Sequence, residues 1–262
     1  MKIAIYQMDI IPGDPVANRD KVKSWTVKVM NQEKPDILVL PEMWTTAYTL
    51  TDLENVAETN EKHTYHFLRE LALHHQVNIV GGSFATVEDD KVYNRAVVFN
   101  RKGEEVYVYD KIHLVPMLNE HLFLEGGKNH SVTFELEGKK MGIIICYDLR
   151  FPELARSLAL EGAEVLFIVA EWPDARKDHW KYLQLARAIE NQMFVVSCNR
   201  VGEYDGVEFA GQSLVVNPWG EIICEGTKDQ EETLTVEMKL EQVKEVRNNV
   251  PVFESRVPHL YK

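Results

Sequence analysis

Short apolar runs alternate with helical patterns in the first third of the chain, and this order constrains the fold more than any other feature. The runs "KIAIYQM" (2–8), "PDILVLPE" (35–42) and "VNIVGGSF" (77–84) are rich in Ile and Val, which favour strands. Helical patterns at 16–33 and 61–76 lie between them. A strand–helix–strand–helix–strand order predicts crossover helices over a sheet of buried strands. We therefore expect an α/β fold.

The rest of the chain continues with strands and helices and shows no linker. A strand pair is expected within 92–111 around the turn "NRKGE", and a second pair on either side of 137–140. Further strands are expected at 163–170, 193–199, 211–217, 221–226 and 232–239, and helices from Pro152 to about Glu161, at 176–192 and before an irregular tail. Because no Ser- or Pro-rich segment divides the 262 residues, we predict a single domain spanning 1–262.

Charge, hydropathy and cysteine content exclude several classes of protein. The chain has 29 basic and 41 acidic residues and a net charge of −12, so a nucleic-acid backbone would be repelled. No stretch approaches the roughly 20 apolar residues of a membrane span. The amino terminus, broken by Asp9, Pro12 and Gly13, differs from a signal peptide. Three scattered cysteines do not make a disulfide framework. We expect a cytoplasmic protein that contacts neither membrane nor nucleic acid.

Cys146 stands at an unusual place, at the end of the apolar strand "MGIIIC" and shortly before the helix expected at Pro152. A thiol is a competent nucleophile when it is ionised, and a helix N-terminus or a nearby cation lowers its pKa. A free cysteine is also commonly a small core residue. That second interpretation is the stronger one for Cys198 and Cys224, which lie within apolar strands. For Cys146, position alone leaves both interpretations open.

Glu42 and Lys111 also stand where apolar strands end, after "ILVLP" and "EVYVYD". Strand ends are where α/β proteins build their sites. Chemistry at a thiol needs a base and a group that stabilises an oxyanion, and a carboxylate and an ammonium can fill these roles. Each charge taken alone could equally mark the point where the chain reaches solvent.

The three positions together resemble a known catalytic pattern. "LPE", "YDKIHL" and "CYDLRFPE" stand in this order, with Glu42, Lys111 and Cys146 separated by 69 and 35 residues. They resemble the Glu–Lys–Cys triad of the nitrilase superfamily of carbon–nitrogen hydrolases. The likeness extends to "NEHLFLEGG" (119–127), to the segments 179–202 and 211–223, and to the tail "VPVFESRVPHLY" (250–261), which looks like that of the omega-amidase branch. It therefore runs from Ile3 to Tyr261.

The resemblance implies a fold and an assembly. The fold of that superfamily is a four-layer αββα sandwich, in which two sheets pack face to face with helices outside. Members associate through an outer helical layer, so at least a homodimer is implied. The helix 176–192 is the candidate surface, and the tail from about 248 to 262 is expected to pack on the partner.

The resemblance also implies a mechanism and roles for individual residues. Glu42 is implied as the base, Cys146 as the nucleophile that attacks an amide carbonyl, and Lys111 with the backbone N–H of Tyr147 as the oxyanion donors. Glu120 matches the second glutamate that braces the lysine; its alternative is an exposed loop charge. A thioester forms and ammonia leaves. No metal or cofactor is implied, since the histidines of 63–66 and 74–75 suit a solvated helix surface and no glycine-rich loop is present.

The omega-amidase likeness implies a small substrate. Such enzymes release ammonia from the terminal amide of dicarboxylate monoamides such as 2-oxoglutaramate. Trp44, Tyr48 and Trp172 are expected to wall the pocket, with ordinary aromatic core as the alternative. The free carboxylate of the substrate needs a cation, preferably a bidentate arginine. Arg150 and Arg176 are the candidates, and the sequence does not choose between them.

Other functions remain open at this point. N-carbamoyl-amine hydrolases share the same triad, usually act on longer amines and release carbon dioxide with ammonia, whereas nitrile hydrolysis is less favoured. A papain-like pair of Cys146 with His113 is conceivable, since His113 is two residues from Lys111. A catalytically silent protein that binds a partner through its helical surface is a third class. The intact Glu42, Lys111 and Cys146 count against it.

Overall fold

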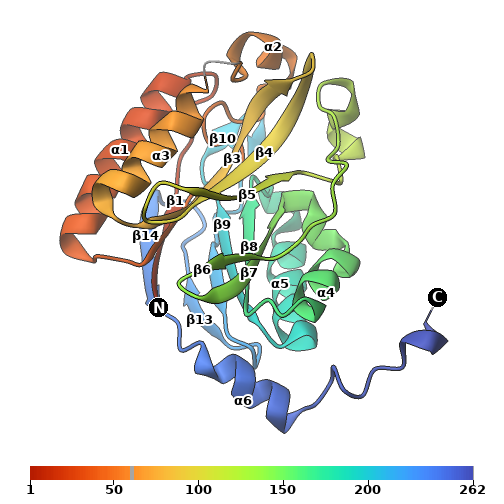
Figure 1. Ribbon diagram of the computed structural model, residues 1–262. Coiled ribbons are helices and arrows are strands. Elements are labelled where there is room, and N and C mark those ends of the chain that lie inside the picture. The colour runs from red at the N-terminus through yellow and green to blue at the C-terminus, as the bar shows by residue number, and fades with distance from the viewer. Residues whose placement is uncertain (60–61, 262) are drawn as a thin grey trace.

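The computed structural model describes residues 1–59 and 62–261, and within that part of the chain two six-stranded sheets form (Figure 1). The first sheet has the spatial order β14 (Glu232–Glu237), β1 (Lys2–Gln7), β2 (Ile37–Val39), β3 (Asn78–Glu88), β4 (Lys91–Phe99), β5 (Glu105–Asp110). The second sheet has the order β13 (Ile222–Glu225), β12 (Leu214–Val216), β9 (Phe194–Asn199), β8 (Val165–Ala170), β7 (Lys139–Ile145), β6 (Phe134–Leu136). The helices are α1 (Pro15–Gln32), α2 (Leu53–Val56), α3 (His63–His75), α4 (Pro152–Leu160), α5 (Lys177–Asn191) and α6 (Glu241–Asn249).

Alternating side chains give the first sheet two different faces. Along β1, Ile3 and Ile5 belong to the core between the two sheets, whereas Ala4 and Tyr6 belong to a second core beneath α1 and α3. This alternation follows from the two-residue period of a strand. Tyr6 stacks on Trp25 of α1 with ring centroids 4.7 Å apart. One sheet therefore separates two apolar cores.

The second sheet is covered on its outer face by α4 and α5. All six residues of β8 are buried, as expected for a strand with a layer on each side. Gly142 of β7 allows α4 to approach closely, because a Cβ there would lie 2.7 Å from Leu158 Cδ1. Figure 1 shows α1 and α3 on one side of the sandwich and α4 and α5 on the other. The predicted four-layer αββα sandwich and the single domain are confirmed.

Most expected elements are present, with shifted ends. The helix expected at 176–192 is α5, and the strand pair expected within 92–111 is β4 and β5. β2 is shorter than expected, since the chain leaves the sheet at Leu40, and β3 is longer because it pairs with β4 as far as Glu88. The expected helix start at Glu61 lies outside the described residues. Across residues 1–59 and 62–261, no helix combines the length and apolar character that crossing a membrane requires.

A short hairpin was not predicted. It joins β10 (Glu203–Tyr204) to β11 (Val207–Glu208) through Asp205 and Gly206, which both have positive φ. An Asp-Gly pair with positive φ at both positions is the preferred two-residue hairpin turn, so "YDGV" carried a usable signal.

Strand directions bring several strand ends together. β1, β2 and β3 are parallel, as are β7, β8 and β9. β5 runs in the direction of β3, because β4 is antiparallel to both. Glu42 follows the end of β2 by three residues, and Lys111, Cys146 and Glu171 come directly after β5, β7 and β8. The Lys111 ammonium and the backbone N–H of Glu171 each donate a hydrogen bond to Glu42. The polar site therefore lies at the carboxyl ends of strands from both sheets.

Candidate active site

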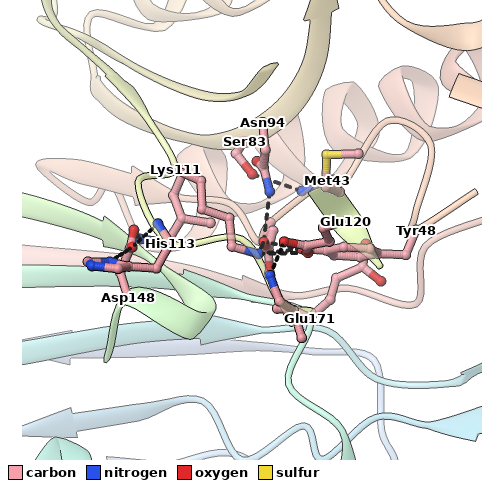
Figure 2. Close-up of polar contacts among 12 residues, drawn as sticks. Met43, Tyr48, Ser83, Asn94, Lys111, His113, Glu120, Asp148 and Glu171 are labelled. Atoms are coloured by element: carbon pink, nitrogen blue, oxygen red, sulfur yellow. Dashed lines mark hydrogen bonds and ion pairs between the residues drawn. The ribbon is translucent and has the colours of Figure 1, made fainter. Parts of the chain in front are cut away.

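Two carboxylates and one ammonium meet in the interior of the protein. Lys111 Nζ lies 3.1 Å from Glu42 Oε1 and 2.9 Å from Glu120 Oε1, and none of the three side chains is exposed to solvent (Figure 2). Glu120 opens a 3₁₀ turn (Glu120–Leu122), and its Oε2 accepts a hydrogen bond of 2.6 Å from the backbone N–H of Val115. Glu120 is thus a buried partner of Lys111, and the alternative of an exposed loop charge is wrong.

The backbone around Glu42 is fixed by the neighbouring strand β3. After Glu42 the chain turns sharply at Met43, whose φ is +45°. The backbone N–H of Met43 donates to Ser83 Oγ at 3.0 Å. Gly82 has a φ of +62°, and a Cβ there would lie 2.1 Å from the carbonyl oxygen of Pro41. Only glycine fits at that position, so "GGS" in β3 is part of the support of Glu42.

Cys146 occupies a strained turn that a buried aspartate holds in place. Its φ is +45°, and it opens a 3₁₀ turn (Cys146–Arg150) directly after β7. Asp148 accepts hydrogen bonds from the backbone N–H of Ile145 at 3.2 Å, from Tyr109 Oη at 2.7 Å and from the backbone N–H of His113 at 3.0 Å. Its Oδ1 also lies 2.8 Å from His113 Nδ1. Asp148 therefore ties the end of β5 to the turn that carries the thiol.

The electrostatics keep the lysine charged and the thiol protonated. Burial alone would lower the pKa of Lys111, but the charges of Glu42 and Glu120 outweigh burial and raise that pKa above its ordinary value. Burial raises the pKa of Cys146 well above its ordinary value, the charge of Glu42 adds to this, and Lys111 opposes it. The helix that begins at Pro152 and the nearby ammonium therefore do not bring the pKa of Cys146 below its ordinary value in the resting protein. A thiol in this state needs a base that takes its proton as it reacts.

Glu42 has three further partners: Asn94 and Glu171, which sequence reasoning missed, and Tyr48, which it placed only at the pocket wall. Its Oε1 accepts hydrogen bonds from Tyr48 Oη at 2.6 Å and from Asn94 Nδ2 at 2.8 Å, and its Oε2 accepts one from the backbone N–H of Glu171 at 2.8 Å. Burial raises the pKa of Glu171 to about 8, against the effect of Arg200, whose Nη1 lies 3.0 Å from Glu171 Oε2. Glu171 follows an apolar strand just as Glu42 does, so the same signal could have identified it.

Cys146 borders a small cavity of about 70 Å³, which we call the inner pocket. Its lining includes most of the expected substrate-binding residues, namely Tyr48, Tyr147, Arg150, Trp172 and Arg176. A larger cavity of about 640 Å³, the outer pocket, shares Tyr48 and Arg176 with it and extends to the β10–β11 hairpin. The thiol therefore lies beside a narrow inner space that shares its wall with a wider one.

The two candidate arginines differ in how firmly they are held. The Arg150 guanidinium carbon lies 4.7 Å from the Trp172 ring centroid and 5.7 Å from that of Tyr147, and Arg150 Nη1 lies 3.3 Å from His179 Nδ1. Arg176 is exposed, and its carbonyl oxygen accepts a hydrogen bond from Trp172 Nε1 at 2.8 Å. Arg150 is thus the arginine with a stacked, pre-oriented guanidinium.

The structure places Trp44 and His113 elsewhere than two of the sequence-based hypotheses required. Trp44 does not line either pocket: it is fully buried in the core beneath α1 and α3, with its Nε1 donating to the carbonyl oxygen of Gly81 at 2.8 Å. The sharp turn after Glu42 directs Trp44 to the helical side of the first sheet. His113 stacks on Phe151 with centroids 3.5 Å apart and bonds Asp148. Its ring is engaged by these residues, which argues against a papain-like pair with Cys146.

Comparison with known proteins agrees with this geometry. The family described as carbon-nitrogen hydrolase matches residues 2–248. A Staphylococcus aureus protein named "Hydrolase in agr operon" is 43% identical over the full length of both chains, and the 2-oxoglutaramate amidase of Bacillus subtilis is 42% identical over 99% of this chain and 98% of its own. The crystal structure of Saccharomyces cerevisiae Nit3, a member of branch 10 of the nitrilase superfamily, superposes with a TM-score of 0.90 at 28% identity, covering 98% of this chain and 96% of that one. The chain therefore belongs to the carbon-nitrogen hydrolase family of the nitrilase superfamily.

Proposed function

We propose that the protein is a cysteine-dependent amidohydrolase that releases ammonia from the terminal amide of a small dicarboxylate monoamide such as 2-oxoglutaramate. The observation that carries the proposal is the buried Glu42–Lys111–Glu120 cluster, which lies beside Cys146 at a pocket that also holds Arg150. The 42% identity to a protein named 2-oxoglutaramate amidase supports the substrate class.

In the first half of the reaction the thiol becomes acylated. Glu42 takes the proton of Cys146 while the sulfur attacks the amide carbon, and the carbonyl oxygen becomes negative. Lys111 and the backbone N–H of Tyr147 stabilise that oxygen. Tyr147 suits this role because the first N–H groups of a helical turn lack partners within the turn. Loss of one such donor typically costs about 2.7–4 kcal/mol of barrier. Glu42 then gives its proton to the leaving nitrogen, ammonia departs, and the thioester on Cys146 completes the first half.

In the second half the acyl group is transferred to water. Glu42 takes a proton from a water molecule as that water attacks the thioester carbon. The C–S bond breaks, the acid leaves, and Glu42 returns the proton to Cys146 Sγ. Glu120 holds Lys111 in place, and its charge keeps the ammonium protonated throughout.

Arg150 is the residue that we assign to the distal carboxylate of the substrate. It lines the inner pocket together with Cys146, and its stacking on Trp172 orients the guanidinium before a ligand arrives. Arg176 lines the inner and the outer pocket and is exposed, so it loses more side-chain freedom on binding. Tyr48 and Trp172 supply the aromatic walls.

A second candidate function is N-carbamoyl-amine hydrolysis. One observation favours it: the outer pocket is lined by Asp174, Asp205 and Glu208, which suit the cationic end of a longer amine. Lys228 opposes this, because its Nζ lies 3.4 Å from Asp174 Oδ1 and 3.1 Å from Glu208 Oε1.

The test is ammonia release from 2-oxoglutaramate compared with N-carbamoylputrescine, with Cys146→Ala as the control. The proposal predicts that the wild type turns over the first substrate only and that the variant turns over neither. Mass spectrometry of the quenched wild-type protein should show a covalent adduct on Cys146. Turnover of the carbamoyl compound alone would select the second candidate. A folded wild-type protein that forms no adduct with any small amide would favour a silent binding protein.

We also propose that the enzyme is a homodimer that uses its carboxyl-terminal tail. Residues 250–261 follow α6 as an extended tail that packs through Phe253 against Arg156 of α4 and exposes Val257, Leu260 and Tyr261 (Figure 1). The outer helix α5 exposes Tyr182 and Ile189. A second copy would cover these apolar side chains. Light scattering should give a dimer for the full chain and a weaker dimer for a chain that ends at 249.

A further inference from the structure

The hydroxyl of Tyr48 sits inside the ionic cluster rather than at the pocket wall alone. Lys111 Nζ donates to Tyr48 Oη at 2.6 Å, and Tyr48 Oη donates to Glu42 Oε1 at 2.6 Å (Figure 2). The phenol can fill both roles because burial, with the charges of Glu120 and Glu42, raises the pKa of Tyr48 well above its ordinary value and keeps it protonated. One hydroxyl therefore bridges the ammonium and the carboxylate.

The hydrogen bonds to Glu42 are unequally divided between its two oxygens. Oε1 accepts from Tyr48 at 2.6 Å, from Asn94 at 2.8 Å and from Lys111 at 3.1 Å, whereas Oε2 accepts from the backbone N–H of Glu171 at 2.8 Å. A carboxylate oxygen offers about two lone-pair sites. Oε1 is therefore fully occupied, and Oε2 retains a site that can take a proton.

All three N–H groups of the Lys111 ammonium have hydrogen-bond partners. Its three N–H groups point to Glu42, Tyr48 and Glu120, with the longest contact, 3.1 Å, to Glu42. When Glu42 becomes neutral by taking a proton, its attraction for the ammonium weakens. The N–H that pointed to Glu42 then becomes available, while Tyr48 and Glu120 still hold the lysine.

We infer that Tyr48 is a positioning residue of the proposed reaction: its hydroxyl occupies Oε1 of Glu42, so that Oε2 takes the thiol proton, and it anchors Lys111 while one ammonium N–H turns to the oxyanion. This inference rests on the proposed function for its purpose, but the arrangement of protons that it describes exists in the free protein. The proton moves from Cys146 Sγ to Glu42 Oε2, and no other group gains or loses one.

The inference has a measurable consequence for the pH dependence of the thiol. The charged or titratable groups that face Glu42 are Tyr48, Lys111 after β5, Cys146 after β7, and Glu120 through Lys111. Glu171 after β8 faces it through its backbone N–H and is itself paired with Arg200. Without the Tyr48 hydroxyl the ionised carboxylate of Glu42 loses its shortest hydrogen bond, which destabilises its charged form relative to its neutral form.

The experiment is alkylation of Cys146 by iodoacetamide, followed by mass spectrometry from about pH 4 to 9, in the wild type, Tyr48→Phe and Tyr6→Phe. Tyr6 is a matched control, since its hydroxyl also donates to a carboxylate, Glu231, at 3.0 Å, but on the far side of the first sheet. Alkylation requires removal of the thiol proton and therefore slows at low pH, which gives the rate profile an acid limb. We expect this acid limb to move up by about one pH unit or more in Tyr48→Phe and to stay in place in Tyr6→Phe.

An acid limb that does not move in Tyr48→Phe would overturn the inference, and a change in substrate KM alone would then leave Tyr48 as a pocket wall. Because alkylation requires no substrate, this result is independent of whether the proposed amide is turned over. Tyr48→Phe keeps the aromatic ring, and a thermal melt that matches the wild type shows that the fold is intact.

Discussion

One buried carboxylate, Glu42, lies beside the thiol of Cys146, and another, Asp148, lies within the turn that carries it; their hydrogen bonds differ in a way that separates proton transfer from structural support. Glu42 and Asp148 are both fully buried. Oε1 of Glu42 accepts hydrogen bonds from an ammonium and from two neutral donors, whereas Oε2 accepts one hydrogen bond, from a backbone N–H. Both oxygens of Asp148 accept hydrogen bonds, two of them from the backbone at the ends of β5 and β7. The first arrangement can exchange a proton, and the second fastens two strand ends.

The largest expected effect is that of Glu42→Gln. An amide cannot take the thiol proton, so ammonia release should fall by about 10²–10⁴-fold in steady-state kcat. The same change removes a negative neighbour that raises the pKa of Cys146, so that pKa should fall, which the thiolate absorbance measured against pH would show. Turnover within tenfold of the wild type would remove Glu42 from its proposed role.

The counterpart, Asp148→Asn, should affect stability before chemistry. Asparagine offers one acceptor oxygen to several buried donors, so the free energy of unfolding should fall by about 3 kcal/mol, measured by urea denaturation. Asp89→Asn is the control, since Asp89 is exposed in the β3–β4 turn with a φ of +49° that asparagine tolerates. A loss no larger than that of the control would show that Asp148 does not fasten the turn.

Neither Glu42 nor Asp148 is expected to bind the substrate carboxylate, which we assign to Arg150. Arg150→Gln removes the stacked cation of the inner pocket, so KM for a carboxylate-bearing amide should rise by about 10- to 100-fold. KM for an uncharged amide should change little, which separates lost charge recognition from pocket damage. If Arg176→Gln had the larger effect, the two arginines would exchange roles.

The smallest effect on turnover is expected for His113→Ala. The ring of His113 belongs to the Asp148 arrangement, so its loss should lower the free energy of unfolding by about 1–2 kcal/mol. Turnover at 25 °C should stay within about tenfold of the wild type. A complete loss of acylation with an intact fold would instead restore a Cys–His pair.

The residues that the sequence located share one local property. Glu42, Lys111 and Cys146 each stand where an apolar strand ends, and that signal can be read without knowing the fold. Trp44 was misplaced because the direction of its side chain depends on a sharp turn at Met43, which "PEMW" does not reveal. Asn94 was missed because its contact with Glu42 depends on strand neighbours in the sheet.

The sequence by itself determined the order of strands and helices and the ionisable residue at several strand ends, because hydrophobic periodicity and strand length are local properties. The tertiary structure decided which of those residues come into contact. The ends of β2, β5, β7 and β8 lie close together only when the two sheets pack face to face. The protonated state of the thiol was decided there too. Burial and the proximity of Glu42 raise its pKa, and neither exists in an extended chain.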